Sequence, residues 1–188
     1  MKEGYLIILM TIFTLLILLY NPVNSYLSNI LSKSINKNPI EKIENISEEY
    51  PIAEISLEGF IKADVSIDEI FIDRAEVSLK AGCYLIHATT DACVAMAIKK
   101  GLEKKVDFRP TVYDVITDAF RNLGIRVLAV KIVEMRENTF IGQLIIQQRD
   151  KILALDIRPS DATAIALRVG APIYINETLA KEVGEYIC

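Results

Sequence analysis

A repeated pattern constrains the fold of this chain more than any other feature. The segment 71–101, FIDRAEVSLKAGCYLIHATTDACVAMAIKKG, lies over 140–170, FIGQLIIQQRDKILALDIRPSDATAIALRVG, without a gap. Both segments begin with Phe-Ile, end with Gly, and pass from strand-like alternation into a helical pattern. Identity between them is low, but the order of elements agrees throughout. An internal duplication explains this agreement most simply.

A further strand pattern precedes each segment, at 53–57 and at 127–133. The two repeats therefore span 53–101 and 127–170, each with three strands and a helix. Runs of strands interrupted by single helices predict an α+β fold rather than a doubly wound sheet. Between the repeats, 112–122 has the apolar spacing of an amphipathic helix.

Ahead of the repeats, residues 5–20 form an apolar stretch whose central 14 residues carry no charge. As a helix it would be about 24 Å long, and a thinned bilayer accommodates a span of that length. The same length suits a secretory signal peptide. Of these two alternatives we favour an uncleaved, single-pass anchor in membrane lipid. A polar linker over 21–51 and a soluble domain over 52–188 follow, and we favour the cytoplasmic side for that domain.

Composition excludes several kinds of chemistry. The three cysteines are odd in number and lack a C-x-x-C spacing, so neither a disulfide framework nor a zinc knuckle is indicated. Cys83 and Cys93 lie in apolar patterns and are expected to be small core residues. His87 is the only histidine, which excludes a histidine-rich metal site. No phosphate-binding or dinucleotide-binding glycine motif occurs, so we expect no organic cofactor.

The charge of the soluble part argues against a broad nucleic-acid footprint. Residues 53–188 contain 17 Lys and Arg against 20 Asp and Glu, a net charge of −3. A non-specific nuclease normally presents a basic surface. The one basic cluster, KKGLEKKVDFR at 99–109, is better explained by cations at a helix C-terminus and a solvated loop.

Two Arg-Pro turns carry the candidate chemistry, and each has a structural interpretation. In FRPTVYD, Thr111 and Asp114 have the spacing of a capping box at the start of the 112–122 helix. In DIRPSDA, Ser160 is placed to cap a helix that begins at Asp161. Arg158 would then bond an acidic neighbour or a loop carbonyl. On this interpretation both turns only begin helices.

The catalytic interpretation uses the same residues. Phosphodiester hydrolysis needs an activated water and neutralisation of the phosphate charge. Asp156 and Asp161 would hold Mg²⁺ or Mn²⁺, and the Arg158 guanidinium would clamp the phosphate. If the two turns converge, Arg109 and Asp114 form a second catalytic set.

The segments FRPTVYDVI, ENTFIGQLII and LDIRPSDATAIALRVGAPIYI resemble the bifunctional nuclease domain family, over 52–181. The resemblance implies two strand–strand–strand–helix repeats that roll into one barrel-like mixed sheet, with DNase and RNase activity in some members. The first repeat departs from the family pattern at CYLIHATTDA (83–92), where Asp91 replaces Glu. His87 there aligns with Asp156 of the second repeat, so it is either a bonded strand histidine or part of the same pocket.

Two hypotheses about function follow. The first is a membrane-anchored, divalent-metal-dependent nuclease that hydrolyses DNA or RNA. The alternative is a non-enzymatic module that binds a ligand or a protein and whose Arg-Pro turns are structural. In either case we expect a homo-oligomer that associates through its sheet.

Overall fold

The computed structural model describes residues 51–188. The anchor predicted over 5–20 and nearly all of the linker predicted over 21–51 therefore lie outside the described residues. Among 51–188, none of the helices combines the length and the apolar content that a bilayer crossing requires.

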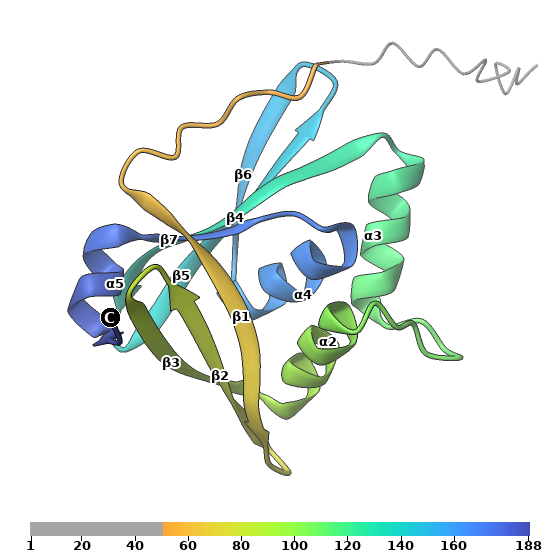
Figure 1. Cartoon of the computed structure of the whole chain (residues 1–188). Helices are drawn as coiled ribbons and strands as arrows, with labels where there is room; N and C mark the ends of the chain where they lie inside the picture. Colours follow the sequence, from red (N-terminus) through yellow and green to blue (C-terminus); the bar gives the residue numbers. More distant parts are fainter. Residues whose placement is uncertain (1–50) are drawn as a thin grey trace, which may run out of the picture. The chain divides into compact units, whose positions relative to one another are not determined.

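The described chain forms one mixed eight-stranded sheet with four helices (Figure 1). The strand order is β6-β5-β4-β7-β1-β2-β3-β8. The first repeat comprises β1 (Phe60–Ile70), β2 (Arg74–Ala81), β3 (Tyr84–Asp91) and α2 (Ala92–Leu102). The second comprises β4 (Ile125–Arg136), β5 (Thr139–Gln148), β6 (Lys151–Ile157) and α4 (Pro159–Val169). The remaining elements are α3 (Val112–Asn122), β7 (Ile173–Asn176), α5 (Glu177–Val183) and β8 (Glu185–Tyr186).

This element order confirms the α+β class and the two strand–strand–strand–helix repeats. Strand β7 lies between them, antiparallel to β1 and parallel to β4. The predicted barrel is wrong, because the sheet is open, with β6 at one edge and β8 at the other. A cavity lies beside β3, the β4–β5 turn and the first turn of α4.

The first strand begins later than predicted. Residues 53–57 form no strand, and β1 starts only at Phe60, after the left-handed turn at Gly59 (φ +72°). Two backbone groups of the preceding segment bond a side chain rather than a neighbouring strand. Gln147 accepts a hydrogen bond from the Ala53 N–H (3.1 Å) and donates one to the Pro51 carbonyl (2.9 Å). The alternation of apolar and polar residues over 53–57 therefore belongs to a segment that does not pair with a strand.

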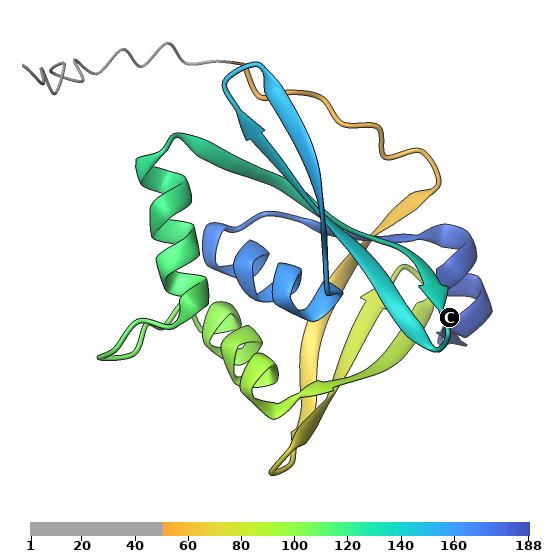
Figure 2. The ribbon, with the colours of Figure 1, turned by 180° about the vertical axis from the view of Figure 1, so that it is seen from behind.

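Helices α2 and α4 pack closely, with their starts together and their ends together. Asp91 and Arg158 are in contact at the starts, and Arg168 bonds the Ala97 carbonyl near the ends. A Cβ atom added at Gly101 would come within 2.9 Å of the Leu167 Cβ, so the glycine permits this close approach. Figures 1 and 2 show α2, α3 and α4 gathered together, with α5 at the far end of the sheet.

The expectation for the cysteines is wrong. Cys83 and Cys188 form a disulfide with a Cα–Cα distance of 5.2 Å, and Cys93 is exposed rather than buried. The C-terminus returns to β3 because β8 pairs with it, which places Cys188 beside the β2–β3 turn. A bond that closes a loop across 105 positions leaves no local spacing to detect. By restricting the unfolded chain, such a crosslink stabilises a fold by about 2–4 kcal/mol.

Candidate functional site

A cavity of about 610 Å³ lies between the two repeats. Its floor is apolar and includes buried side chains from both halves of the sheet and from α2. Polar side chains lie around it, on β3, on the β4–β5 turn and on the first turn of α4. The floor includes Val77, Leu79, Ile86, Ile98, Ile132 and Ile175, and the polar lining residues include Arg74, Asp91, Asn138, Thr139, Arg158 and Ser160.

Arg158 joins the two repeats at this cavity. Its Nε donates to Asp161 Oδ2 at 2.6 Å, and its Nη1 donates to Asp91 Oδ2 at 3.0 Å. Asp91 and Asp161 are equivalent residues when the repeat alignment is moved by one position. The bonds to Asp161 and Asp91 raise the pKa of Arg158 above its usual value. The side chain is 62% exposed, so it stays reachable from solvent.

Asp161 is held from two sides. Oδ2 receives the bond from Arg158, and Oδ1 receives a hydrogen bond of 2.6 Å from the Tyr113 hydroxyl on α3. Burial and the bond to Asp161 raise the pKa of Tyr113 to about 12. Tyr113 therefore remains a neutral donor at physiological pH and connects α3 to the first turn of α4. Tyr113 was not predicted from the sequence as a site residue, because its partner lies 48 residues away.

Ser160 does not cap α4, so that prediction is wrong. The N-cap residue is Arg158, Pro159 occupies the first helical position, and no side-chain capping bond is made. The helix starts two residues earlier than expected because a proline at the first position has no N–H to satisfy. Ser160 instead lines the cavity.

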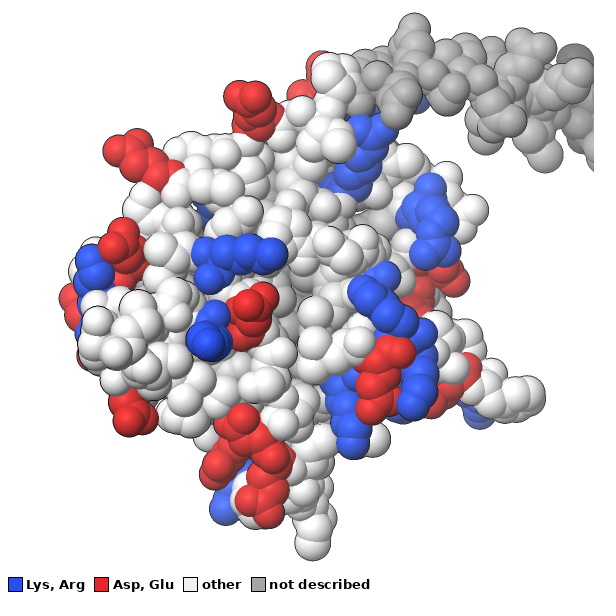
Figure 3. Space-filling model, viewed as in Figure 1, with Lys and Arg blue, Asp and Glu red and all other residues white. Residues whose placement is uncertain are grey.

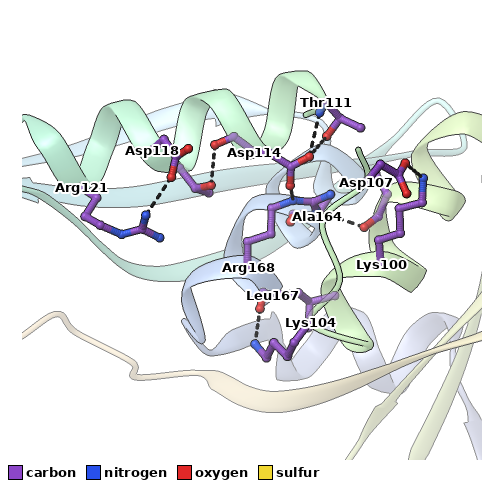
Figure 4. A network of polar contacts seen from close by, with 12 residues as sticks. Lys100, Lys104, Asp107, Thr111, Asp114, Asp118, Arg121, Ala164, Leu167 and Arg168 are labelled. Atoms are coloured by element: carbon purple, nitrogen blue, oxygen red, sulfur yellow. Dashed lines mark hydrogen bonds and ion pairs between the residues drawn. The ribbon is translucent and has the colours of Figure 1, made fainter. Parts of the chain in front are cut away.

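The first Arg-Pro turn has different surroundings. Thr111 is the N-cap of α3 and forms the predicted capping box with Asp114. The Asp114 carboxylate accepts from the Thr111 N–H at 2.7 Å and from Arg168 Nε at 2.6 Å (Figure 4). Burial would raise the pKa of Asp114, but hydrogen bonds from the Thr111 hydroxyl, from Arg168 and from the Thr111 N–H outweigh burial and lower its pKa to about 2. Arg109 is exposed, and neither Arg109 nor Asp114 lines the cavity.

Arg168, which was not predicted from the sequence as a site residue, is the buried partner of Asp114. Its side chain is 8% exposed and that of Asp114 is 7% exposed. Nη1 donates to the carbonyls of Ala97 (3.0 Å) and Ala164 (2.7 Å), so the guanidinium ties α2, α3 and α4 together. Lys104 adds a bond to the Leu167 carbonyl nearby (Figure 4). The sequence did contain one indication of this buried contact, namely that Arg168 lies in a helix otherwise rich in alanine.

Neither of the two predicted metal ligands, Asp156 and Asp161, lines the cavity. Asp156 is an exposed residue on β6, opposite Gln143, and does not line the cavity. Asp91, which lines the cavity, and Asp161, which does not, both accept a hydrogen bond from Arg158, so each carboxylate already faces a cation. Within residues 51–188, no group of three His, Cys, Asp or Glu side chains is placed to hold a metal ion. Two carboxylates suit Mg²⁺ only where phosphate oxygens or water complete its coordination.

His87 is a bonded strand histidine. Its Nδ1 lies 3.0 Å from the Ser78 hydroxyl, which also donates to Asp68 Oδ2 at 2.5 Å. These contacts lie within the first repeat, across β1, β2 and β3. Asp156 takes no part in these contacts and does not line the cavity, but His87 lines the same cavity as Arg158. His87 is therefore both a bonded strand histidine and part of that pocket, with Arg158 rather than Asp156 as its neighbour from the second repeat.

The geometry defines a class of protein: a duplicated α+β domain whose repeats meet at an arginine between two aspartates. The chain belongs to the bifunctional nuclease domain family, whose model matches residues 85–187. That range runs from β3 to the C-terminus and contains both Arg-Pro turns.

Several relatives match part of the chain. An uncharacterized protein of Mycobacterium tuberculosis is 43% identical over 76 residues, which are 40% of this chain and 44% of that protein. Bifunctional nuclease 1 of Oryza sativa subsp. indica is 33% identical over 79 residues, 40% of this chain and 24% of the rice protein. Bifunctional nuclease 1 of Arabidopsis thaliana is 32% identical over 79 residues, which are again 40% of this chain and 24% of that protein. The chain thus spans less than half the length of these relatives.

Proposed function

We propose that this chain is a nuclease that hydrolyses phosphodiester bonds of DNA or RNA at the mouth of the cavity. The position of Arg158 carries the proposal, because an exposed guanidinium stands at the junction of the two repeats and beside a cavity. Family membership and relatives named bifunctional nucleases support the same reaction.

Arg158 would bind the phosphate of the substrate. A guanidinium offers a planar fork of donors that matches two phosphate oxygens. The pair with Asp91 is exposed on both sides, and an exposed pair of this kind contributes little stability. A phosphate group can therefore replace Asp91 as the partner of Nη1, while Asp161 keeps Nε in place.

Dependence on Mg²⁺ or Mn²⁺ is part of the proposal. Such an ion would neutralise phosphate charge and supply an activated water. Asp91 and Asp161 would hold it together with oxygens of the substrate, because both bond Arg158, which lines the cavity. Asp91 is the better candidate of the two, since Tyr113 and Arg158 already occupy both oxygens of Asp161.

The test is cleavage by the purified full-length chain in detergent, with Mg²⁺, with Mn²⁺ and with a chelator. Asp91→Asn and Asp161→Asn should each lower cleavage at least tenfold, because charge and not size is removed. Asp118→Asn is the matched control, since Asp118 pairs with Arg121 on the exposed side of α3. Absence of cleavage by the parent chain would contradict the proposal and favour the non-enzymatic binding module.

Location and assembly are proposals as well. Retention in the membrane fraction after carbonate washing would support the anchor over 5–20. The Cys83–Cys188 disulfide favours an oxidising compartment for the soluble domain rather than the cytoplasm. Self-association through the sheet would use the β6 edge, where Ile152, Leu153 and Leu155 are exposed.

A further inference from the structure

We infer that the apolar floor of the cavity is a subsite for a nucleobase, so that the substrate is a single strand rather than a duplex. This inference rests on the proposed function for the phosphate position at Arg158. It adds the substrate class, which neither the family nor its relatives assign to these residues.

The floor has the chemistry of a base-binding surface. Its walls are aliphatic side chains from β2, β3, β4, β7 and α2, and Phe140 lies at the start of β5. Ligand pockets that enclose small molecules have volumes of about 300–1,000 Å³, which includes this cavity. A phosphate or a sugar gains nothing from an aliphatic wall. A base presents two π faces to such a surface and can stack on Phe140.

Polar groups lie where the edge of a base needs them. Thr163, which is buried on α4, lines the same cavity, and so do Asn138 and Thr139 at the β4–β5 turn. Hydroxyl and amide groups both donate and accept hydrogen bonds, as the Watson–Crick edge of a base requires. Arg158 and Ser160 lie at the start of the same helix as Thr163. One nucleotide could therefore place its phosphate on Arg158 and its base on the floor.

The charge of the domain disfavours a duplex. A duplex is bound through many phosphates at once, which calls for a row of cations. Arg74 and Arg158 are the only Lys or Arg residues that line the cavity within the described chain, and Arg158 faces two aspartates. Figure 3 shows acidic and basic side chains interspersed over the visible face, without a continuous basic stripe. A paired base must also leave its stack before it can enter a pocket, whereas an unpaired base pays no such cost.

The experiment compares the binding of adenosine monophosphate with that of ribose 5-phosphate, which has the phosphate and the sugar but no base. Calorimetry on the full-length chain in detergent should give an affinity about tenfold higher, or more, for the nucleotide. Phe140→Ala should remove most of this difference and leave the affinity for ribose 5-phosphate unchanged, and Phe140→Tyr should retain the difference. Leu153→Ala, an exposed position on β6, is the control for the loss of a large apolar side chain.

A second measurement compares cleavage of a single-stranded oligonucleotide with that of its duplex. The single strand should be cut at least tenfold faster. Equal affinities for the two phosphates, no saturable binding of the nucleotide at millimolar concentration, or equal cleavage of duplex and single strand would each overturn the subsite. Preference for the nucleotide without any cleavage would contradict the proposed hydrolysis but retain the base site. The two failures are therefore distinguishable.

Discussion

The two Arg-Pro turns of this chain begin helices in opposite environments. At the first, Arg109 is exposed, and Asp114 is buried against Arg168. At the second, Arg158 bridges two aspartates at the cavity, and the nearer one, Asp161, is only partly buried. The first turn thus places its carboxylate in the interior, and the second places its arginine at a surface that a ligand can reach.

The difference arises from where each helix begins relative to its proline. Helix α3 has Thr111 as its N-cap, one residue after Pro110. Helix α4 has Arg158 as its N-cap, with Pro159 as the first helical residue. Arg158 is therefore fixed at the N-terminal end of α4, beside Asp161 in the first turn of that helix. The same Arg-Pro pair therefore precedes a capping box at the start of α3 and places a charged arginine between the two repeats at the start of α4.

The largest expected effect separates the buried pair from the exposed one. Arg168→Gln should lower the free energy of unfolding by about 3–5 kcal/mol, because it leaves Asp114 buried without its cation. Arg158→Gln should cost less than about 1 kcal/mol, since its partners are accessible to water. Urea unfolding of the full-length variants in detergent measures both. Equal losses would contradict the assignment of one turn to the interior and the other to the surface.

The pH dependence of stability should follow Asp114. Its pKa is about 2 in the folded chain and 3.8 ordinarily, so its contribution is fully present above about pH 4. That contribution is lost as the pH falls from about 4 to 2, and it amounts to about 2 kcal/mol. Unfolding free energies measured across this window should fall less steeply for Asp114→Asn than for the parent. Parallel pH profiles would show that Asp114 is not the titrating group.

The smallest effect concerns the two hydroxyl residues. Thr111→Ala should lower the unfolding free energy by about 0.5–2 kcal/mol, because the capping box is lost. Ser160→Ala should change it by no more than about 0.5 kcal/mol, since Ser160 makes no capping bond. Thermal or urea unfolding of the pair is sufficient. If Ser160→Ala lowered the unfolding free energy as much as Thr111→Ala does, Ser160 would have to act as a helix cap after all.

Local patterns were enough to predict the elements that local bonds define. The α3 helix over 112–122 and its capping box both agree with the prediction from the sequence, because each depends on residues close together in the chain. The repeat order was predicted for a related reason, since both copies keep the same period of alternation and helix.

The candidate site was predicted only in part, because most of its contacts join residues far apart in the chain. Arg158 and Asp161 were identified from one turn, and their bond is local. Asp91 is 67 residues from Arg158, and Arg168 is 54 residues from Asp114. Only the packing of α2, α3 and α4 creates these pairs. Asp156 was chosen for its position near the end of a strand, where alternation directs it away from the cavity.

The most direct test of the central claim compares the two arginines in one cleavage assay. Arg158→Lys and Arg109→Lys each keep the charge and remove the fork of donors. The account predicts that Arg158→Lys lowers the cleavage rate of a single-stranded oligonucleotide at least tenfold, with an unchanged unfolding free energy, while Arg109→Lys cleaves as the parent does. Full activity in Arg158→Lys, or an equal loss in both variants, would contradict a phosphate site at the junction of the two repeats.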